Sequence, residues 1–259
     1  MRVAIWNLGW NRNSDQLQTM WSILREEIGA DVALLQETAP PESFPRVWEP
    51  IKGRRWGSAV VGFTVELKEV VESKGRAGSA PQPLRNTWPG SVAIAQTVTA
   101  TGPVTFVSCY GVIENGYADT TVNRQLSDLA PLFDDPVLSP RLIFGGDLNI
   151  TTQWTGRESR YRLWQAATFG RIKAFGLNDC LDLHRPPGPL EGCACLDGDD
   201  CRHIQTQRHK FSHRPWQNDY LFASQLASKT GTLTRAYVHD SDVIRDLGDH
   251  LPLVADFNF

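Results

Sequence analysis

The sequence lacks several features that would assign it to a class at once. Its formal net charge is only −3, so the chain as a whole does not have the basic excess of many nucleic-acid binders. No apolar run approaches the roughly 20 residues of a membrane helix, and we expect no membrane association. The first residues, MRVAIWNLGW, contain no basic start followed by an apolar segment. We therefore expect no secretory signal and a cytoplasmic protein.

Cysteine is scarce and odd in number, with five residues in 259. Without a secretory signal, this favours reduced thiols over a disulfide framework. The composition, 41% hydrophobic and 21% charged, is ordinary for a soluble globular protein. No internal repeat, low-complexity tract or linker divides the sequence, so we expect a single domain over residues 1–259.

Short apolar runs bounded by Gly, Pro, Asn and Asp recur along the chain and predict β-strands. They cover residues 3–6, 32–36, 58–63, 92–96, 104–110, 141–147, 219–224 and 251–257. Helical spacing of apolar residues predicts helices over 14–29, with Ser14 as the cap, and over 119–133 and 157–175. The mixture predicts an α/β fold with two sheets face to face and helices outside.

Polar residues follow or begin several of the predicted strands. Taken one at a time, they are more typical of turns, solvated positions or structural histidines. Their joint occurrence at strand ends, which converge on one side of a sheet, predicts a shared pocket. The residues are Asn7, Glu37, Tyr110, Asp147, Asn149, Asp219, Asp249 and His250.

Seven motifs along the chain carry a resemblance to a known family. In order they are WNLGW at 6–10, LLQE at 34–37, WGSAVV at 56–61, SCY at 108–110, GGDLN at 145–149, NDYLFAS at 218–224 and GDHLPLVADF at 248–257. The series resembles the endonuclease/exonuclease/phosphatase superfamily, which includes deoxyribonuclease-like and abasic-site endonucleases. The resemblance implies a four-layer α/β sandwich of two mixed β-sheets and a phosphoesterase activity.

Hard oxygen ligands of the kind found here suit Mg²⁺ or Mn²⁺. Glu37 is the first candidate for a metal carboxylate, with Asn7 beside it and Asp249 as a further contact. The metal would polarise a phosphoryl oxygen.

His250 is a candidate general base, or, as an imidazolium, a group that holds the phosphate. The resemblance implies that Asp219 orients it. Asp147, with Asn149, would orient the attacking water or stabilise the leaving oxygen, and Tyr110 would donate a hydrogen bond to the phosphate. No motif supplies a covalent nucleophile, and Cys109, which precedes Tyr110, is expected in the core.

A polar segment at about 184–210 departs from the family pattern, and we expect it to be a loop insertion. It contains Cys193, Cys195, Cys201 and His203, a C-x-C-x₅-C-x-H set. Thiolates and an imidazole suit a closed structural Zn²⁺ site. The spacing is not a common zinc-finger pattern, so free structural thiols and a redox or disulfide role stay open as alternatives.

A basic stretch that also holds aromatic residues follows this set. It suits a nucleic-acid backbone and splayed bases, although it would equally form a solvated face that balances the acidic residues at 197–200. The candidate substrate-binding residues are Arg202, Arg208, Lys210, Arg214 and Trp216.

The leading functional prediction is a metal-dependent nuclease acting on DNA or RNA, monomeric and without an obligate protein partner. The alternative is a phosphatase or phosphodiesterase for a small molecule such as a nucleotide, phosphoinositide or phospholipid headgroup. A non-catalytic binding protein would be expected to lose residues of the predicted pocket, and none is lost.

Overall fold

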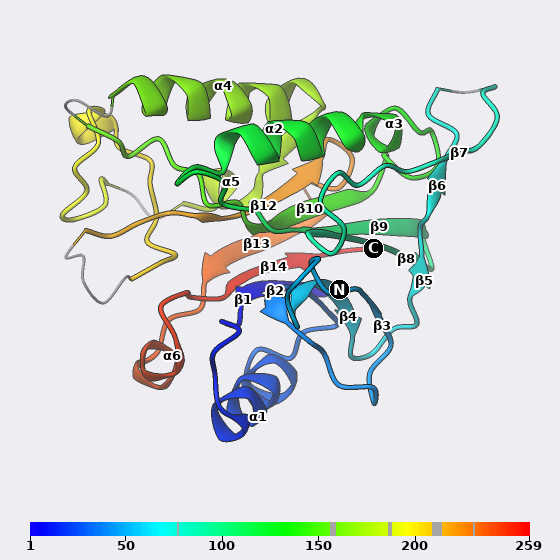
Figure 1. Ribbon diagram of the computed structural model, residues 1–259, viewed down its shortest axis with the longest axis horizontal. Coiled ribbons are helices and arrows are strands. Elements are labelled where there is room, and N and C mark those ends of the chain that lie inside the picture. The colour runs from blue at the N-terminus through cyan, green and yellow to red at the C-terminus, as the bar shows by residue number, and fades with distance from the viewer. Residues whose placement is uncertain (77, 156–158, 186–187, 209–213, 230) are drawn as a thin grey trace.

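The computed structural model describes residues 1–259 except 77, 156–158, 186–187, 209–213 and 230. In the described part of the chain, two six-stranded mixed sheets lie face to face (Figure 1). The first sheet has the order β13 (Leu233–Val238), β14 (Leu253–Phe257), β1 (Arg2–Asn7), β2 (Val32–Thr38), β4 (Gly57–Gly62) and β3 (Arg46–Trp48). The second has the order β11 (Leu177–Asp179), β12 (Asp219–Ser224), β10 (Leu142–Asp147), β9 (Gly102–Cys109), β8 (Val92–Thr99) and β5 (Lys68–Glu69).

Helices cover the outer face of each sheet, which completes the four predicted layers (Figure 1). The first sheet carries α1 (Ser14–Ser22), its π-helical continuation η1 (Ile23–Glu27) and α6 (Asp242–Leu247). The second carries α2 (Asp119–Asp128), α3 (Ala130–Phe133) and α4 (Ser159–Ala174). Shorter elements are β6 (Glu72–Ser73) paired with β7 (Gln82–Pro83), α5 (Cys180–Leu183) and η3 (Gly198–Asp200). Within the described residues, no helix is both long and apolar enough to cross a membrane.

The strand sequences explain this layering because alternate side chains point to opposite faces. In β1, Val3 and Ile5 enter the core between the sheets, whereas Ala4 and Trp6 face the helices of the first sheet. In β9, Phe106 enters the same central core. These residues are fully buried, and their transfer from water drives the sheets together.

The cap of the first helix corrects one sequence expectation. Asn13, and not Ser14, is the N-cap. The Asn13 side chain accepts a hydrogen bond from the backbone N–H of Gln16, and the Gln16 side chain accepts one from the backbone N–H of Asn13. This reciprocal pair of hydrogen bonds satisfies two backbone N–H groups at the start of the helix. Ser14 is the first residue of the helix itself and does not form this cap.

Strand register brings the predicted polar residues to one end of the sandwich. Parallel β1 and β2 place Asn7 opposite Gln36, and antiparallel β10 and β12 place Asp147 opposite Asp219. Gly146 has a φ of +148°, and a Cβ there would lie 2.0 Å from the carbonyl oxygen of Cys109. Only glycine therefore lets β10 pass this close to the end of β9.

Candidate active site

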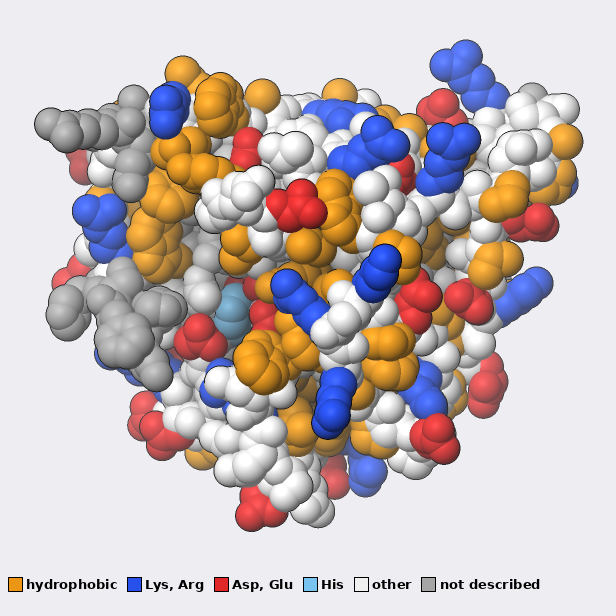
Figure 2. Space-filling view, viewed as in Figure 1, with side chains coloured by type: hydrophobic (Ala, Val, Ile, Leu, Met, Phe, Trp, Pro, Cys, Tyr) orange, Lys and Arg blue, Asp and Glu red, His pale blue; other side chains and the backbone are white. Residues whose placement is uncertain are grey.

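A cavity of about 450 Å³ opens at this end of the two sheets. Both sheets contribute to its lining. Figure 2 shows a recess on this face, where acidic side chains surround a histidine and basic side chains lie along the rim. The lining includes seven of the eight predicted residues, namely Asn7, Glu37, Tyr110, Asp147, Asn149, Asp249 and His250.

The eighth residue, Asp219, lies directly behind His250. Its carboxylate accepts a hydrogen bond from His250 Nδ1, at 2.9 Å from Oδ2 and 3.1 Å from Oδ1. On the other side, Nε2 of His250 lies 3.8 Å from Oδ2 of Asp147. The histidine is thus held between two carboxylates, and all three residues are buried.

The two carboxylates determine the charge of the imidazole. Burial acts to lower the pKa of His250, but the charges of Asp219 and Asp147 outweigh it and raise that pKa to about 10. The buried imidazole therefore carries a positive charge at neutral pH. Burial raises the pKa of Asp147 to about 7; the charge of His250 opposes this rise, and the charge of Asp219 adds to it.

Asparagine side chains fix the Asp147 carboxylate. Asn7 Nδ2 donates to Oδ2 at 2.8 Å, and Asn149 Nδ2 donates to the same oxygen at 3.3 Å. The backbone N–H of Asn149 donates to Oδ1 at 3.0 Å. Asn149 has a φ of +52°, a left-handed conformation that asparagine adopts more readily than most residues and that turns the chain back on Asp147. Asp147 and Asn149 therefore lie against each other in the cavity, and their joint role stays a prediction.

Glu37 lies across the cavity from this group and also occupies the left-handed region, with a φ of +52°. It interrupts the pairing of β2 with β4, whose register shifts between Leu35 and Thr38. Such backbone strain is typical of functional positions. The Glu37 carboxylate accepts from the backbone N–H of Trp10 at 3.3 Å and is hydrogen-bonded to Tyr110. Burial raises the pKa of Tyr110, and the charges of Glu37 and Asp147 raise it further.

Asp249 reaches the same cavity but is already engaged. Arg12 lies 3.2 Å from its Oδ1, and Gln207 Nε2 donates to its Oδ2 at 3.4 Å. A role for Asp249 as a metal ligand therefore competes with this ion pair and stays a prediction.

Sequence reasoning missed Gln207 and Arg12. Gln207 Nε2 lies 3.1 Å from Nε2 of His250, and its Oε1 accepts from Asn218 Nδ2 at 2.5 Å. Neither residue belongs to a strand end, so no local pattern marks them. Both residues lie in loops that fold back to the site.

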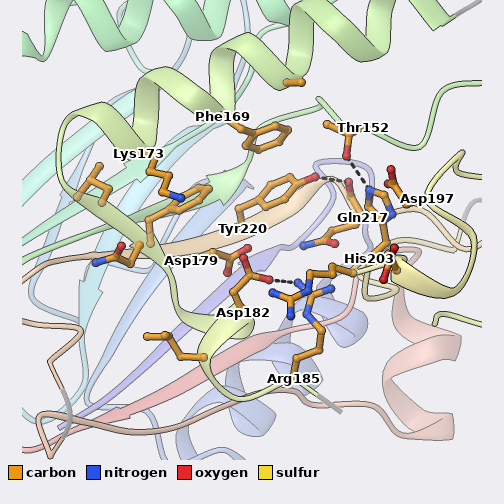
Figure 3. A pocket seen from close by; sticks show the side chains of 17 residues that line it. Thr152, Phe169, Lys173, Asp179, Asp182, Arg185, Asp197, His203, Gln217 and Tyr220 are labelled. Atoms are coloured by element: carbon orange, nitrogen blue, oxygen red, sulfur yellow. Dashed lines mark hydrogen bonds and ion pairs between the residues drawn. The ribbon is translucent and has the colours of Figure 1, made fainter. Parts of the chain in front are cut away.

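The predicted substrate-binding residues do not form one group. Arg208 lines the active-site cavity. Arg202 lines a separate cavity of about 570 Å³, drawn in Figure 3, which shares no described lining residue with the first. Trp216 packs on Trp154 with ring centroids 5.4 Å apart. Arg214 is exposed, and Lys210 lies outside the described residues.

A further cavity, of about 760 Å³, adjoins the site at Glu37. Arg54 and Arg55 line it together with Trp10 and Trp56. The Arg54 guanidinium stacks 4.5 Å above the Trp56 ring, and Trp10 is 63% exposed. Two cationic side chains and the exposed Trp10 ring therefore extend from Glu37 along the surface. Sequence analysis did not select these four residues.

The other predicted metal set also comes together in space. Cys193, Cys195, Cys201 and His203 place one ligand atom each within 4.8 Å of one another. Cys109, in contrast, is fully buried, as predicted, and burial raises the pKa of its thiol.

A sequence model described as the Endonuclease/Exonuclease/phosphatase family matches residues 4–250. No curated protein matches the chain by sequence. Solved structures do match. An AP endonuclease from Archaeoglobus fulgidus is 14% identical over all of both chains, with a TM-score of 0.65.

Two further structures have the same fold. The endonuclease domain of TRAS1, a telomere-specific non-LTR retrotransposon, is 17% identical over 100% of this chain and 98% of its own, with a TM-score of 0.64. The human Nocturnin catalytic domain, solved with a bound sulfate anion, is 15% identical over 100% and 94%, with a TM-score of 0.54. At these identities the structural likeness shows the predicted α/β sandwich and no more. An argument for function has to rest on the residues and geometry of the site.

Proposed function

Because the chain belongs to the endonuclease/exonuclease/phosphatase family, whose members hydrolyse phosphoester bonds, we propose that it is a divalent-metal-dependent nuclease. The observation that carries the proposal is the Asp219–His250–Asp147 group, buried at one end of the sandwich and facing a cavity of about 450 Å³. This group combines a charged donor with a carboxylate whose pKa is near neutrality, which suits hydrolysis by activated water.

The charges of the site fit a divalent cation. Glu37, Asp147 and Asp219 bring three carboxylates close to His250, and the charges of Asp219 and Glu37 contribute to the raised pKa of Asp147. Glu37 and Asn7 would hold Mg²⁺ or Mn²⁺ through oxygen atoms, the ligands that these ions prefer. When bound, the ion would neutralise this surplus and polarise a phosphoryl oxygen.

Side chains of the protein would supply proton transfer and the hydrogen bonds to the phosphate. Asp147, held by Asn7 and Asn149, would take a proton from the attacking water, whose oxygen bonds to phosphorus as the ester P–O bond breaks. His250, charged and fixed by Asp219, would donate from Nε2 to a non-bridging phosphate oxygen. Tyr110 would donate a further hydrogen bond. Such donors stabilise charge that develops in the transition state.

A nucleic-acid substrate is supported by the surface beside Glu37. Arg54 and Arg55 would meet phosphates along a strand, and the exposed Trp10 ring and the exposed Arg54 guanidinium, which stacks on the buried Trp56, offer faces for bases. Two of the structural relatives are named as endonucleases, which is consistent with this choice. The single domain over 1–259, the monomeric state and the cytoplasmic location also stay proposals.

The test is cleavage of labelled single- and double-stranded DNA and RNA with Mg²⁺ or Mn²⁺. We expect turnover that Asp147→Asn and His250→Ala abolish while the circular dichroism spectrum is retained. Full activity in either variant would contradict the mechanism. A chelator-treated sample and Glu27→Gln, which alters a carboxylate–histidine pair outside the site, serve as controls.

Hydrolysis of a small phosphorylated molecule is the second candidate, because the net charge is −3 and the catalytic cavity has the size of a small-ligand site. Arg54→Ala separates the two. For a nuclease it weakens polymer cleavage through KM but leaves hydrolysis of a small diester unchanged. Arg235→Ala is the matched control, since Arg235 stacks 4.1 Å above the Tyr237 ring in the same way. Hydrolysis of the diester with no cleavage of any polymer would favour the small substrate.

A further inference from the structure

The four residues of the Cys/His set form a compact group in the long connection between α5 and β12. Cys193 and Cys195 precede the short helix η3, and Cys201 and His203 follow it. That helix turns the chain back, so that residues up to ten apart in sequence meet. Cys201 is buried and the other three are half-buried. Such depth favours a structural role over a reactive surface thiol.

Two nitrogen–sulfur distances within the set match those of a tetrahedral zinc site. Nδ1 of His203 lies 3.7 Å from Sγ of Cys193 and 3.5 Å from Sγ of Cys201. Zinc bonds of about 2.3 Å to sulfur and 2.0–2.1 Å to nitrogen at tetrahedral angles predict a nitrogen–sulfur distance of about 3.6 Å. The four residues would fill all four positions with protein ligands, and the three cysteines among them are free of disulfides.

The surroundings orient these ligands. The other ring nitrogen of His203, Nε2, lies 2.7 Å from Oγ1 of Thr152, and Figure 3 shows the ring turned toward this hydroxyl. Gln153 Nε2 donates to Sγ of Cys193 at 3.2 Å. Backbone N–H groups of His203 and Leu190 donate to Sγ of Cys201. Outer partners of this kind fix the orientation of metal-binding histidines and stabilise thiolates.

We propose that Cys193, Cys195, Cys201 and His203 bind one Zn²⁺ as a closed structural site, separate from the catalytic cation. The sulfur ligands select Zn²⁺ over the Mg²⁺ or Mn²⁺ of the phosphoesterase site, which offers oxygen. Binding would displace the thiol protons, and the released binding free energy would offset the entropy lost in ordering a polar loop.

The site would also support the catalytic group. The chain continues from His203 to Ile204, whose N–H donates to Oε1 of Gln217 at 2.9 Å. Gln153, which contacts Cys193, accepts from the N–H of Gln217 at 2.7 Å. The segment after Gln217 then begins β12 with Asp219, the partner of His250. The metal would thus hold in place the two chain segments that contain Ile204 and Gln217.

A second path from the site runs through Thr206. Its Oγ1 accepts from the backbone N–H groups of Asn218 and Asp219, both at 3.1 Å. The next residue, Gln207, contacts His250. Loss of zinc is therefore expected to lower kcat without removing any catalytic residue.

The test is metal analysis of the purified full chain, expressed in zinc-supplemented medium, together with optical spectra after replacement by Co²⁺. We expect about one equivalent of zinc per chain and the thiolate-to-cobalt charge-transfer bands of a tetrahedral site. Cys195→Ser and Cys201→Ser should lose both signals. Cys109→Ser is the matched control, because it removes a buried thiol outside the set and should keep them.

His203→Cys guards against a variant that simply fails to fold, since it preserves a four-ligand set and should retain zinc. Wild-type protein without bound zinc and without the cobalt spectrum would overturn the proposal, as would a disulfide within the set or equal zinc in all variants. These readouts do not depend on phosphoesterase activity. Failure here therefore leaves the proposed function intact, and failure of the nuclease assay leaves the zinc result intact.

Discussion

We expect Asp219→Asn to lower kcat by about 10²- to 10⁴-fold, the range in which positioned acid–base groups act. The structure gives the reason. Asp219 and Asp147 hold the pKa of His250 at about 10, against 6.5 for the free group, and this difference corresponds to roughly 5 kcal/mol in favour of the charged ring. Asparagine keeps the shape of Asp219 but removes its charge, so only the charges of Asp147 and Asp249 are left to oppose burial, and the pKa of His250 falls.

Two measurements check this expectation. The pH–rate profile of the variant should lose activity at a lower pH than the wild type, because the imidazolium deprotonates earlier. Nuclear magnetic resonance titration of the metal-free protein should report the lower pKa of His250 directly. Glu27→Gln, which removes the carboxylate 2.7 Å from the half-buried His239, should leave both unchanged. An unchanged pKa of His250, or kcat within a few-fold of wild type, would refute the reasoning.

Four further predictions follow from other contacts. Gly146→Ala should lower the free energy of unfolding by about 2–4 kcal/mol, since the new Cβ would lie 2.0 Å from a backbone oxygen. Gly170→Ala in α4 is the control, because its Cβ would meet no atom within 4 Å, and it should be neutral or stabilising. Urea unfolding of both variants measures the difference. Asp179 has a pKa raised to about 7, chiefly by burial, so it binds a proton in the folded state and wild-type stability falls as pH rises from about 4 to 7. Because Asp179 borders a cavity, we expect on the order of 1–2 kcal/mol, less than the roughly 4 kcal/mol of full burial, and Asp179→Asn should reduce the slope in thermal melts at pH 4, 6 and 8 to the part that Asp147 contributes through its own raised pKa. Gln207→Ala should reduce kcat by about tenfold, because it removes the hydrogen bonds to Asn218 and Asp249 that hold this side chain 3.1 Å from Nε2 of His250, with KM unchanged in steady-state assays. Chelation should abolish turnover, and added Mg²⁺ or Mn²⁺ should restore it; activity that survives chelation would remove the metal from the mechanism.

The central strands were predictable from the sequence because they are buried on both faces. Short apolar runs such as VALLQ and RLIFGGD favour buried strands, and they form β2 and β10. Edge strands were missed for the converse reason. In β13, Leu233–Val238, two of six positions are buried, so its pattern resembles that of a loop. The Asn13 cap had a readable signal, because Gln16 follows it by three residues in the spacing of a capping box.

The convergence of the candidate site residues was predictable because strand ends meet wherever strands align. Their convergence needed no knowledge of loop paths. Gln207, Arg12 and the Arg54–Trp56 stack depend on how loops return to the site, and single-sequence periodicity carries no information on that. The Cys/His set was predictable as a chemical pattern, whereas its mutual distances required the turn made by η3.

The division of the site between the two sheets has a consequence for how the protein loses activity. Asn7 belongs to the first sheet and Asp147 to the second, and the 2.8 Å hydrogen bond between them crosses the sandwich. Gln36 Nε2 crosses it again to reach Ser108 at 2.9 Å. A slight sliding of one sheet over the other would break these bonds while each sheet kept its own strand pairing. Heat inactivation is therefore expected to begin below the temperature at which secondary structure melts, so that enzymatic turnover reports on sheet alignment more sensitively than circular dichroism does.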